Sequence, residues 1–447
     1  MTAPTRVGTR ATYPARVARL VLWGVVLVNV AIVEYLVFTA APSKNGLIAA
    51  AKFFGLNAAA IMILQVVLVA RLPWLDRRIG MDRLTSWHRW TGFALFWAVL
   101  LHVSLILVGY SRYDRVPILR EVTGFAGIFQ TLVGMIAAGI IVIAVVLSVR
   151  LARRRLSYEA WHAVHVCLYV AIALALIHQL YESSTFKANP LTWAYWWVLW
   201  TLALVALVIG RVVLPLRRNA RHQLRVARVV PESDNVVSVY VTGRELEGLR
   251  ARPGQFFIWH FLGHNRWWQA NPFSLSAAPD GQSLRLTAKA VGKTSAGLRE
   301  VPVGTRVFAE GPYGAFTTLH RSREGTLLIA GGVGITPIRA LLEELDGSVI
   351  VAYRVHSDSD AVLLGELQEL ARDRGARVHV LAGRTGAGTP PNTPFAPENL
   401  RALVPDINER DVFVCGPPAM TATVLSSLRA LGVPKRQVHA ERFSLAS

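Results

Sequence analysis

The sequence contains very little cysteine and comparatively few acidic residues. Only two cysteines, Cys167 and Cys415, occur in 447 residues. A framework of several disulfides and a metal site built from cysteine thiolates are therefore excluded. The 28 acidic residues are outnumbered by 48 basic ones, which gives a formal net charge of +20. Such an excess is typical of proteins that bind nucleic acid or of membrane proteins with basic loops.

Long apolar stretches decide between these two classes. The mean hydropathy is +0.39, and the apolar runs all lie before about residue 215. Much of the basic excess lies beside them, so we interpret the chain as a protein of the lipid bilayer and expect no nucleic-acid partner. Six stretches have the roughly 20 residues that cross a bilayer: Val17–Phe38, Leu47–Ala70, Ser86–Tyr110, Gly124–Val149, Glu159–Leu180 and Leu191–Leu214.

Arginines gather before the first stretch and in alternate loops. The positive-inside rule therefore places both termini, and everything after residue 215, on the cytoplasmic side of the cell membrane. The first apolar run is too long for a cleaved signal peptide, and residues 1–16 form a basic tail. The residues that set this orientation are Arg6, Arg10, Arg16, Arg19, Arg71, Arg77, Arg78, Arg83, Arg150, Arg153, Arg154, Arg155, Arg211, Arg217, Arg218 and Arg221.

The pattern changes after residue 215, which predicts a multidomain chain. Residues 17–215 are expected to form an all-α bundle of six membrane helices. Residues 216–322 contain short runs of period two, which predict a small antiparallel β-barrel. Residues 323–447 alternate strands with helices and predict a doubly wound α/β domain. The expected strands are Val226–Val230, Val236–Val241, Gln255–Trp259, Ser283–Lys289, Arg306–Glu310, Leu327–Ala330, Val349–Tyr353, Val378–Leu381 and Val412–Cys415.

Five histidines lie in the apolar stretches or at their ends: His88 and His102 in the third, and His162, His165 and His178 in the fifth. A polar group at membrane depth needs a partner and is a functional candidate. His88 and His102 are fourteen residues apart. This spacing places them roughly 21 Å apart along a helix, with an azimuthal offset of about 40°. Two such layers of imidazole predict two metal centres stacked across the bilayer.

An iron porphyrin with one imidazole on each face suits this spacing, because bis-imidazole ligation gives an electron-transfer haem. Zinc needs a compact tetrahedral set of ligands, which the spacing does not provide. His165 and His178 are thirteen residues apart, which leaves them about 140° apart on an ideal helix. We therefore expect a π-bulge or a kink between them. His162, one turn before His165, is the rival for the inner position.

The arrangement of these histidines resembles that of the ferric reductase and NADPH oxidase superfamily. The resemblance covers nearly everything after the first apolar stretch, and Ser157–Glu159 is similar to the segment before the family's inner ligand. It implies that His88 and His165 hold an inner b-type haem, and that His102 and His178 hold an outer one. His162 has no role in that pattern.

The soluble half carries motifs similar to the FAD domain of this superfamily. Pro253–Phe256 looks like its barrel strand, and Asn271–Ser276 resembles its flavin signature, although a histidine often stands where Asn271 stands here. Val291–Leu298 is similar to the turn that holds the FAD diphosphate, where amides at a helix start and hydroxyl groups suit an anion. The residues implied to hold FAD are Pro272, Phe273, Ser274, Gly292, Lys293, Thr294 and Ser295.

Two further motifs resemble the nicotinamide-nucleotide site of the same family. Ala330–Pro337 follows an apolar strand and opens a helix, and its glycines let the backbone approach a dinucleotide. Thr336 is the expected N-cap and Pro337 the expected first-turn residue of that helix. Cys415–Pro418 matches a second signature at a strand end. The residues implied to hold the nucleotide are Gly331, Gly332, Gly334, Thr336, Pro337, Gly416 and Pro417.

Arg384 follows the third strand of this domain and favours NADPH over NADH, because a guanidinium suits a 2′-phosphate. The resemblance also places Cys415 beside the nicotinamide and Phe443 over the flavin, which makes them the candidate catalytic residues. It implies an oxidoreductase that passes electrons from NADPH through FAD and two haems to an acceptor across the membrane. Dioxygen, a ferric chelate and a membrane quinone are the candidate acceptors.

A six-helix channel with a regulatory nucleotide domain is the alternative from another class. It predicts a regularly spaced arginine helix or a pore loop, and neither occurs in the sequence. A calcium loop of the EF-hand kind is also absent from the sequence.

Overall fold

The computed structural model describes residues 15–149, 158–182, 184–187, 189–264, 269, 271–386 and 392–442. The chain divides into two compact units, Met1–Leu72 with Arg83–Arg211 and Pro73–Asp82 with Val212–Ser447. The basic segment of residues 150–155, on which part of the predicted orientation rests, lies outside the described residues.

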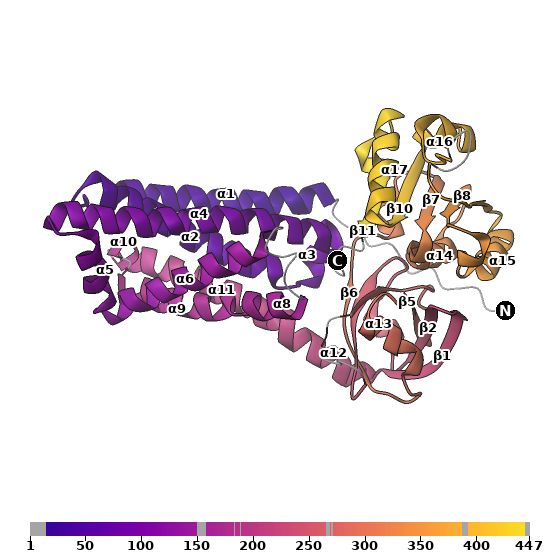
Figure 1. Ribbon diagram of the computed structural model, residues 1–447, viewed down its shortest axis with the longest axis horizontal. Helices are drawn as coiled ribbons and strands as arrows, with labels where there is room; N and C mark the ends of the chain where they lie inside the picture. Colours follow the sequence, from indigo (N-terminus) through magenta and orange to yellow (C-terminus); the bar gives the residue numbers. More distant parts are fainter. Residues whose placement is uncertain are drawn as a thin grey trace. The chain divides into compact units, whose positions relative to one another are not determined.

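Six helical spans in the described residues are long and apolar enough to cross a membrane, as predicted. Figure 1 shows these helices running side by side. Their shared core consists mainly of small and aliphatic side chains, together with the buried indoles of Trp196 and Trp200. The spans are built from α1 (Ala15–Thr39), α2 (Gly46–Val69), α4 (Met81–Asp114), α6 (Phe129–Ser148), α8 (Tyr158–Val166), α9 (Leu168–Glu182) and α11 (Pro190–Val208).

Several short helical elements of the chain were not predicted. The sixth span does not end at Leu214 but continues through a π-helical turn, η1 (Ile209–Val213), into α12 (Leu214–His222). Pro215 lies at the start of α12, and a proline there removes a backbone donor that an uninterrupted α-helix would use. The other short helices are α3 (Pro73–Ile79), α5 (Ile118–Ala126) and α10 (Ser184–Lys187).

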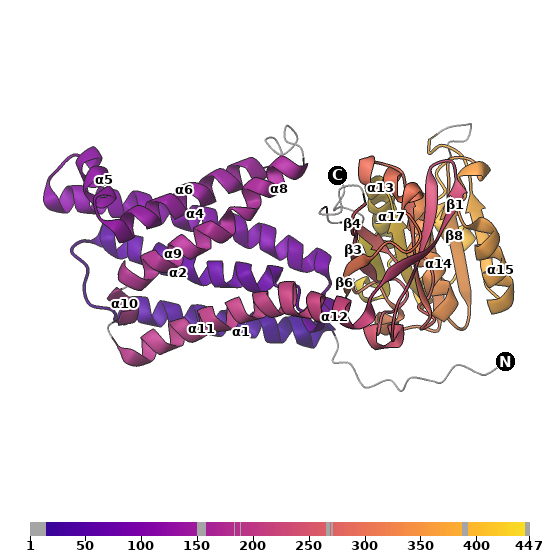
Figure 2. The same cartoon turned by 90° about the horizontal axis from the view of Figure 1, so that it is seen from below.

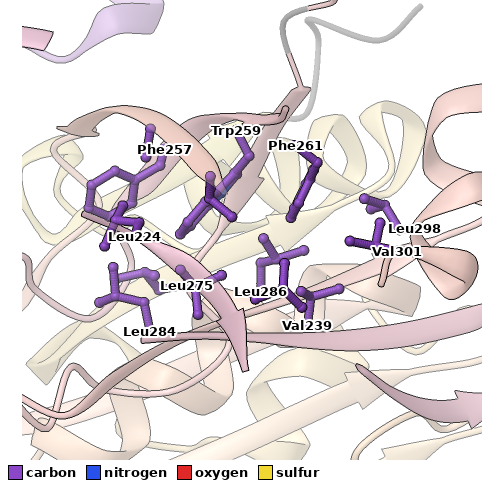
Figure 3. Packing of buried hydrophobic residues seen from close by; sticks show 14 of the residues in the cluster. Leu224, Val239, Phe257, Trp259, Phe261, Leu275, Leu284, Leu286, Leu298 and Val301 are labelled. Carbon is purple, nitrogen blue, oxygen red and sulfur yellow. The ribbon is translucent and has the colours of Figure 1, made fainter. Parts of the chain in front are cut away.

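In the first part of the second unit, residues 225–313 form six antiparallel strands, the five that were predicted and β4, which was not. They form two three-stranded sheets, with strand orders β1-β2-β5 and β4-β3-β6. Isolated bridges, Arg225 with Arg306 and Leu275 with Leu286, join the two sheets at both edges. Figure 3 shows the aromatic and aliphatic side chains that fill the space between them. The strands are β1 (Arg225–Ser233), β2 (Val236–Thr242), β3 (Phe256–Phe261), β4 (Asn271–Ser274), β5 (Ser283–Lys289) and β6 (Val307–Tyr313).

The second part is a parallel sheet with strand order β11-β10-β7-β8-β9. Its faces carry separate cores, one with α14 (Ile335–Glu344) and α15 (Leu364–Arg374), the other with α16 (Pro397–Leu403) and α17 (Pro418–Ala430). Figure 1 shows these helix pairs on opposite faces of the sheet, and Figure 2 gives a second view in which α14, α15 and α17 are labelled. The predicted doubly wound fold is therefore confirmed. The strands are β7 (Gly325–Gly331), β8 (Val349–Arg354), β9 (Arg377–Leu381), β10 (Arg410–Gly416) and β11 (Val438–Arg442).

Candidate functional site

The membrane unit holds two facing pairs of histidines. The ring centroids of His88 and His165 are 6.0 Å apart, and those of His102 and His178 are 6.4 Å apart. An imidazole nitrogen binds a metal at about 2.0 Å, so two rings on opposite sides of one metal stand roughly 6 Å apart. Both pairs have this spacing, and both combine α4 with the interrupted helix α8–α9.

Hydrogen bonds fix the rings of the second pair. Nδ1 of His102 lies 2.8 Å from the Ala51 carbonyl oxygen, and Nδ1 of His178 lies 3.0 Å from that of Gln130. A carbonyl oxygen only accepts, so Nδ1 of each ring carries the proton. Nε2 then keeps its lone pair, as metal-ligating histidines require.

Two glycines make room for the same two rings. A Cβ at Gly55 on α2 would lie 2.7 Å from Nδ1 of His102, and a Cβ at Gly134 on α6 would lie 2.6 Å from Nδ1 of His178. Any side chain at either position would displace the imidazole. The surrounding helices are therefore shaped around this pair.

The first pair lies in a different environment. The indole of Trp161 stacks on His165 with a centroid distance of 5.1 Å. Nδ1 of His88 and Nδ1 of His165 are buried and have no hydrogen-bond partner among the described residues. His162 is exposed, and its ring lies 6.5 Å from that of Trp161. Among the described residues, His165 is the histidine of this helix that faces His88.

The fifth span has the irregularity that its histidine spacing predicts. The chain is helical up to Val166 and again from Leu168, with Cys167 in a turn between. The Cys167 amide bonds the Val164 carbonyl at 3.1 Å, three residues back. A tightened turn changes the angular position of the following residues. His165 and His178 consequently both face α4.

The predicted flavin motif forms β4, paired with β3. The Asn271 side-chain amide donates to the carbonyl oxygens of Trp259 and Gln269 at 3.3 and 3.0 Å, so it holds neighbouring backbone in place. Phe273 is half-buried and packs against the core between the two antiparallel sheets, and Ser274 is buried. Pro272 is half-buried opposite Ile258 of β3.

The predicted diphosphate turn opens the short helix α13 (Lys293–Gly297). The Ser295 hydroxyl accepts hydrogen bonds from the amides of Val291 and Gly292 at 3.0 and 3.1 Å. The Ser295 hydroxyl therefore stabilises the turn. The sequence had predicted that this hydroxyl would bind an anion. The backbones of Lys293 and Thr294 form the first turn of the helix.

The two nucleotide motifs meet at the carboxyl ends of β7 and β10. These strands are neighbours in the centre of the sheet, where the strand order reverses and open α/β sheets bind their ligands. A Cβ at Gly334 would overlap the Cys415 carbonyl oxygen, and one at Gly331 would overlap the Met420 side chain. Cys415 is buried and Pro417 is exposed. The glycines are therefore required for the two loops to touch.

The prediction that Thr336 caps α14 is wrong. The helix begins at Ile335 after a short 3₁₀ turn, and Gly334 occupies the N-cap position. The Thr336 hydroxyl donates to the Val333 carbonyl at 3.0 Å, inside the first turn. Pro337 follows it in that turn, where a missing amide hydrogen costs nothing. Gly332 has a φ of +52°, which favours glycine.

Arg384 is exposed in the loop after β9, and a second arginine organises that loop. Nη1 of Arg354, at the end of β8, donates to the carbonyl oxygens of Leu381 and Ala382 at 2.7 and 3.0 Å. Burial lowers the pKa of Arg354. Arg354 was missed because an arginine at a strand end gives no distinguishing signal in the sequence.

Phe443 lies outside the described residues. The preceding strand β11 runs parallel to β10, with Glu441 opposite Cys415 and Arg442 opposite Gly416. This strand was not predicted. A cluster formed by Ser276, Arg285, Arg339 and Glu366 was also missed.

Family models match three parts of the chain. Residues 54–176 match a ferric reductase like transmembrane component. Residues 221–317 match an FAD-binding domain, and residues 328–425 match an oxidoreductase NAD-binding domain. The three matches follow the order of the membrane helices, the antiparallel strands and the parallel sheet.

Curated relatives cover different parts of the chain. The reductase component of propane 2-monooxygenase from Rhodococcus jostii is 29% identical over 235 residues, which is 49% of this chain and 63% of that protein. The ferredoxin reductase component of 3-ketosteroid-9-alpha-monooxygenase from Mycolicibacterium smegmatis is 33% identical over 238 residues, 49% of this chain and 65% of that protein. The chain thus spans less than two thirds of the length of either relative.

A third relative extends over the membrane helices. Dual oxidase 2 from Homo sapiens is 22% identical over 443 residues, which is 81% of this chain and 28% of that protein. Among solved structures, the FAD/NAD binding domain of nitric oxide dioxygenase from Vibrio cholerae is 26% identical, with a TM-score of 0.42, and covers 50% of this chain and 99% of that domain. In this chain a segment similar to a ferric reductase like transmembrane component is thus joined to a segment similar to an FAD-binding domain and to one similar to an oxidoreductase NAD-binding domain.

Proposed function

We propose that this chain carries electrons from NADPH through FAD and two b-type haems to an acceptor on the far side of the cell membrane. The observation that carries the proposal is the pair of facing histidines at each of two levels, at centroid distances of 6.0 and 6.4 Å. NAD(P)H-dependent electron transfer itself follows from the membrane component and the two nucleotide-binding domains. The domains we propose are a tail of residues 1–16, then residues 17–215, 216–322 and 323–447.

The residues present fit a haem at each level. His88 and His165 would hold the inner one, and His102 and His178 the outer one, with Ala51 and Gln130 orienting the outer imidazoles. The buried Nδ1 atoms of the inner pair have no hydrogen-bond partner among the described residues, so no protein hydrogen bond fixes the tautomer of these two rings. When bound, each haem supplies a one-electron carrier whose potential depends on its axial ligands. The apolar helices exclude water and position both.

The soluble domains would accept the electrons as hydride. We propose that Gly331, Gly332, Gly334, Gly416 and Pro417 hold NADPH at the carboxyl ends of β7 and β10. FAD would lie against β4 at Pro272, Phe273 and Ser274, with its diphosphate at α13. Cys415 and Phe443 would border the two reacting rings. The arginines of the loops support a cytoplasmic location for these domains, by the positive-inside rule.

We propose a ferric chelate with anionic ligands as the acceptor, and dioxygen as the alternative. An open surface pocket of about 580 Å³ is lined by Asn45, Gly46, Leu47, Arg112, Tyr113 and Arg115. It lies beyond the His102 end of α4 and the start of α2. Lys44 adds a third cation, 4.6 Å from the Tyr113 ring centroid. Guanidinium groups pair with carboxylates, which supports an anionic substrate.

Anaerobic addition of NADPH to the purified protein is expected to reduce the flavin and then a b-type haem signal. Addition of ferric citrate should reoxidise the haem and release Fe(II) in stoichiometric amounts. Air should instead produce superoxide if dioxygen is the acceptor. Ferric reduction that continues without oxygen, with no superoxide in air, would exclude the oxidase alternative. No haem reduction by NADPH would contradict the electron path.

Arg384→Ala is expected to raise the KM for NADPH roughly tenfold while leaving the KM for NADH unchanged. The exposed guanidinium would pair with the 2′-phosphate, which NADH lacks. Arg401→Ala, at another exposed arginine of the same domain, is the matched control. Equal changes in the KM values for NADPH and NADH would show that Arg384 does not bind the 2′-phosphate.

A further inference from the structure

Ser276, which ends the flavin motif, is fully buried and all of its polar groups are engaged. Its amide donates to the Arg285 carbonyl at 2.8 Å. Its hydroxyl accepts from Nε of Arg285 at 3.0 Å and from the Thr287 hydroxyl at 2.7 Å. Its carbonyl oxygen accepts from Nη2 of Arg285 at 2.7 Å and from Nη1 of Arg339 at 3.2 Å. Two guanidinium groups therefore meet at one backbone carbonyl.

The carboxylate of Glu366 joins these two arginines. Both of its oxygens lie 2.9 Å from Nη1 of Arg285. One of them also lies 2.8 Å from Nε of Arg339. Arg339 additionally pairs with Glu343, which accepts from the Ala278 amide at 3.2 Å. The cluster thus balances two cations with two carboxylates.

Burial makes this balance necessary. Arg285 is 3% exposed and Arg339 is 9% exposed. Burial and the charge of Arg285 lower the pKa of Arg339 to about 10, and Glu366 acts in the opposite direction. A buried cation that loses its partner carries a large desolvation penalty. Without Glu366, Arg285 would lose this carboxylate while Arg339 kept Glu343, and the repulsion between the two guanidinium groups would favour their separation.

The three charged residues come from three elements with different tasks. Arg285 is on β5 of the barrel, beside the end of the flavin motif. Arg339 is on α14, the helix that begins directly after Gly334 of the nucleotide loop. Glu366 is on α15 and reaches both. The cluster therefore ties the end of the flavin motif to the helix that carries the nucleotide loop.

We infer that Glu366 is a positioning residue for hydride transfer, because it holds the nucleotide loop at a fixed distance from the flavin motif through Arg339 and Arg285. The inference rests on the FAD and NADPH half of the proposed function and is independent of the haems. In this step NADPH loses two electrons and a proton as hydride, and FAD gains them. Glu366 touches neither group and acts through the arginines alone.

Glu366→Gln in the full-length holoenzyme is expected to slow flavin reduction at saturating NADPH by about 10- to 100-fold, the loss that a misplacement of roughly 1 Å causes. Stopped-flow flavin absorbance measures this rate. The deuterium isotope effect from 4-deuterated NADPH should rise in steady-state turnover. Electron transfer out of chemically reduced flavin should keep its wild-type rate. A wild-type flavin-reduction rate in this variant would overturn the inference.

Arg339→Gln tests the same link from its other end. It leaves Arg285, Glu366 and Ser276 in contact, and it should slow flavin reduction as Glu366→Gln does. The double variant should be no slower than the slower single variant, because both remove one link; additive losses would contradict the inference. Glu369→Gln, at an exposed glutamate three residues along α15, is the matched control and should behave as wild type.

If Glu366→Gln loses its FAD, its flavin-reduction rate cannot be measured, and Glu366→Asp is used instead. Aspartate keeps the negative charge on a shorter side chain. An FAD-containing Glu366→Asp that reduces flavin several-fold more slowly than wild type supports the inference. Wild-type rates in Glu366→Asp and Arg339→Gln would assign the cluster to folding alone and overturn it. If NADPH fails to reduce the flavin of the wild-type protein, that result would instead contradict the proposed function.

Discussion

Replacing His178 with alanine is expected to abolish reduction of the external acceptor while leaving reduction of the flavin by NADPH intact. The imidazole of His178 faces that of His102 at 6.4 Å and is held by the Gln130 carbonyl. Alanine would remove one of the two axial ligands of the outer haem. Acceptor reduction should fall by at least about 100-fold, since axial ligation sets both the binding and the potential of a haem. Fe(II) formation and flavin bleaching measure the two steps.

His162→Ala is the matched control for this variant. It removes an exposed histidine from the same interrupted helix, and it should retain both activities. Loss of acceptor reduction in His162→Ala, with normal activity in His165→Ala, would mean that the inner ligand has been assigned to the wrong histidine.

Replacing Gly334 with alanine is expected to slow flavin reduction by NADPH by about 100-fold. The new methyl group would overlap the Cys415 carbonyl oxygen, which is backbone and cannot rotate away. The glycine loop and the end of β10 would have to separate, and displacements of about 1 Å at a reacting centre cost this much. Stopped-flow reduction by NADPH measures the effect.

Gly365→Ala provides the control, because a Cβ at that position in the same domain meets open space. It should reduce flavin at the wild-type rate. Chemically reduced flavin in Gly334→Ala should still pass electrons onward normally. A Gly334→Ala variant with unchanged NADPH kinetics would contradict the placement of the nucleotide at this loop.

Features that follow from spacing were predictable from the sequence. The fourteen-residue interval on α4 fixes two levels of imidazole, because helix geometry is nearly invariant. The thirteen-residue interval demanded an interruption, and the turn at Cys167 is the interruption found. Four of the five parallel strands of the last domain, β7, β8, β9 and β10, were predicted because buried strands are continuous apolar runs.

Features that depend on tertiary contact were not predictable. The ion cluster around Ser276 joins residues up to 90 positions apart. In the sequence alone, its arginines and its glutamate cannot be distinguished from ordinary surface charges. Strand β11 contains histidine, glutamate and arginine, and its pairing with β10 overrides that polar composition. Thr336 is a good N-cap by residue type, but the 3₁₀ turn of the glycine loop moves the helix start to Ile335.

The haem content of the purified protein tests the central claim most directly. A pyridine haemochrome assay, compared with the flavin content of the same sample, should give two b-type haems per FAD, and a reduced-minus-oxidised spectrum should show both responding to NADPH. His102→Ala should lower the ratio to one. A wild-type protein that contains FAD but no b-type haem would contradict the account. So would a wild-type protein with a single haem that the His102→Ala variant retains.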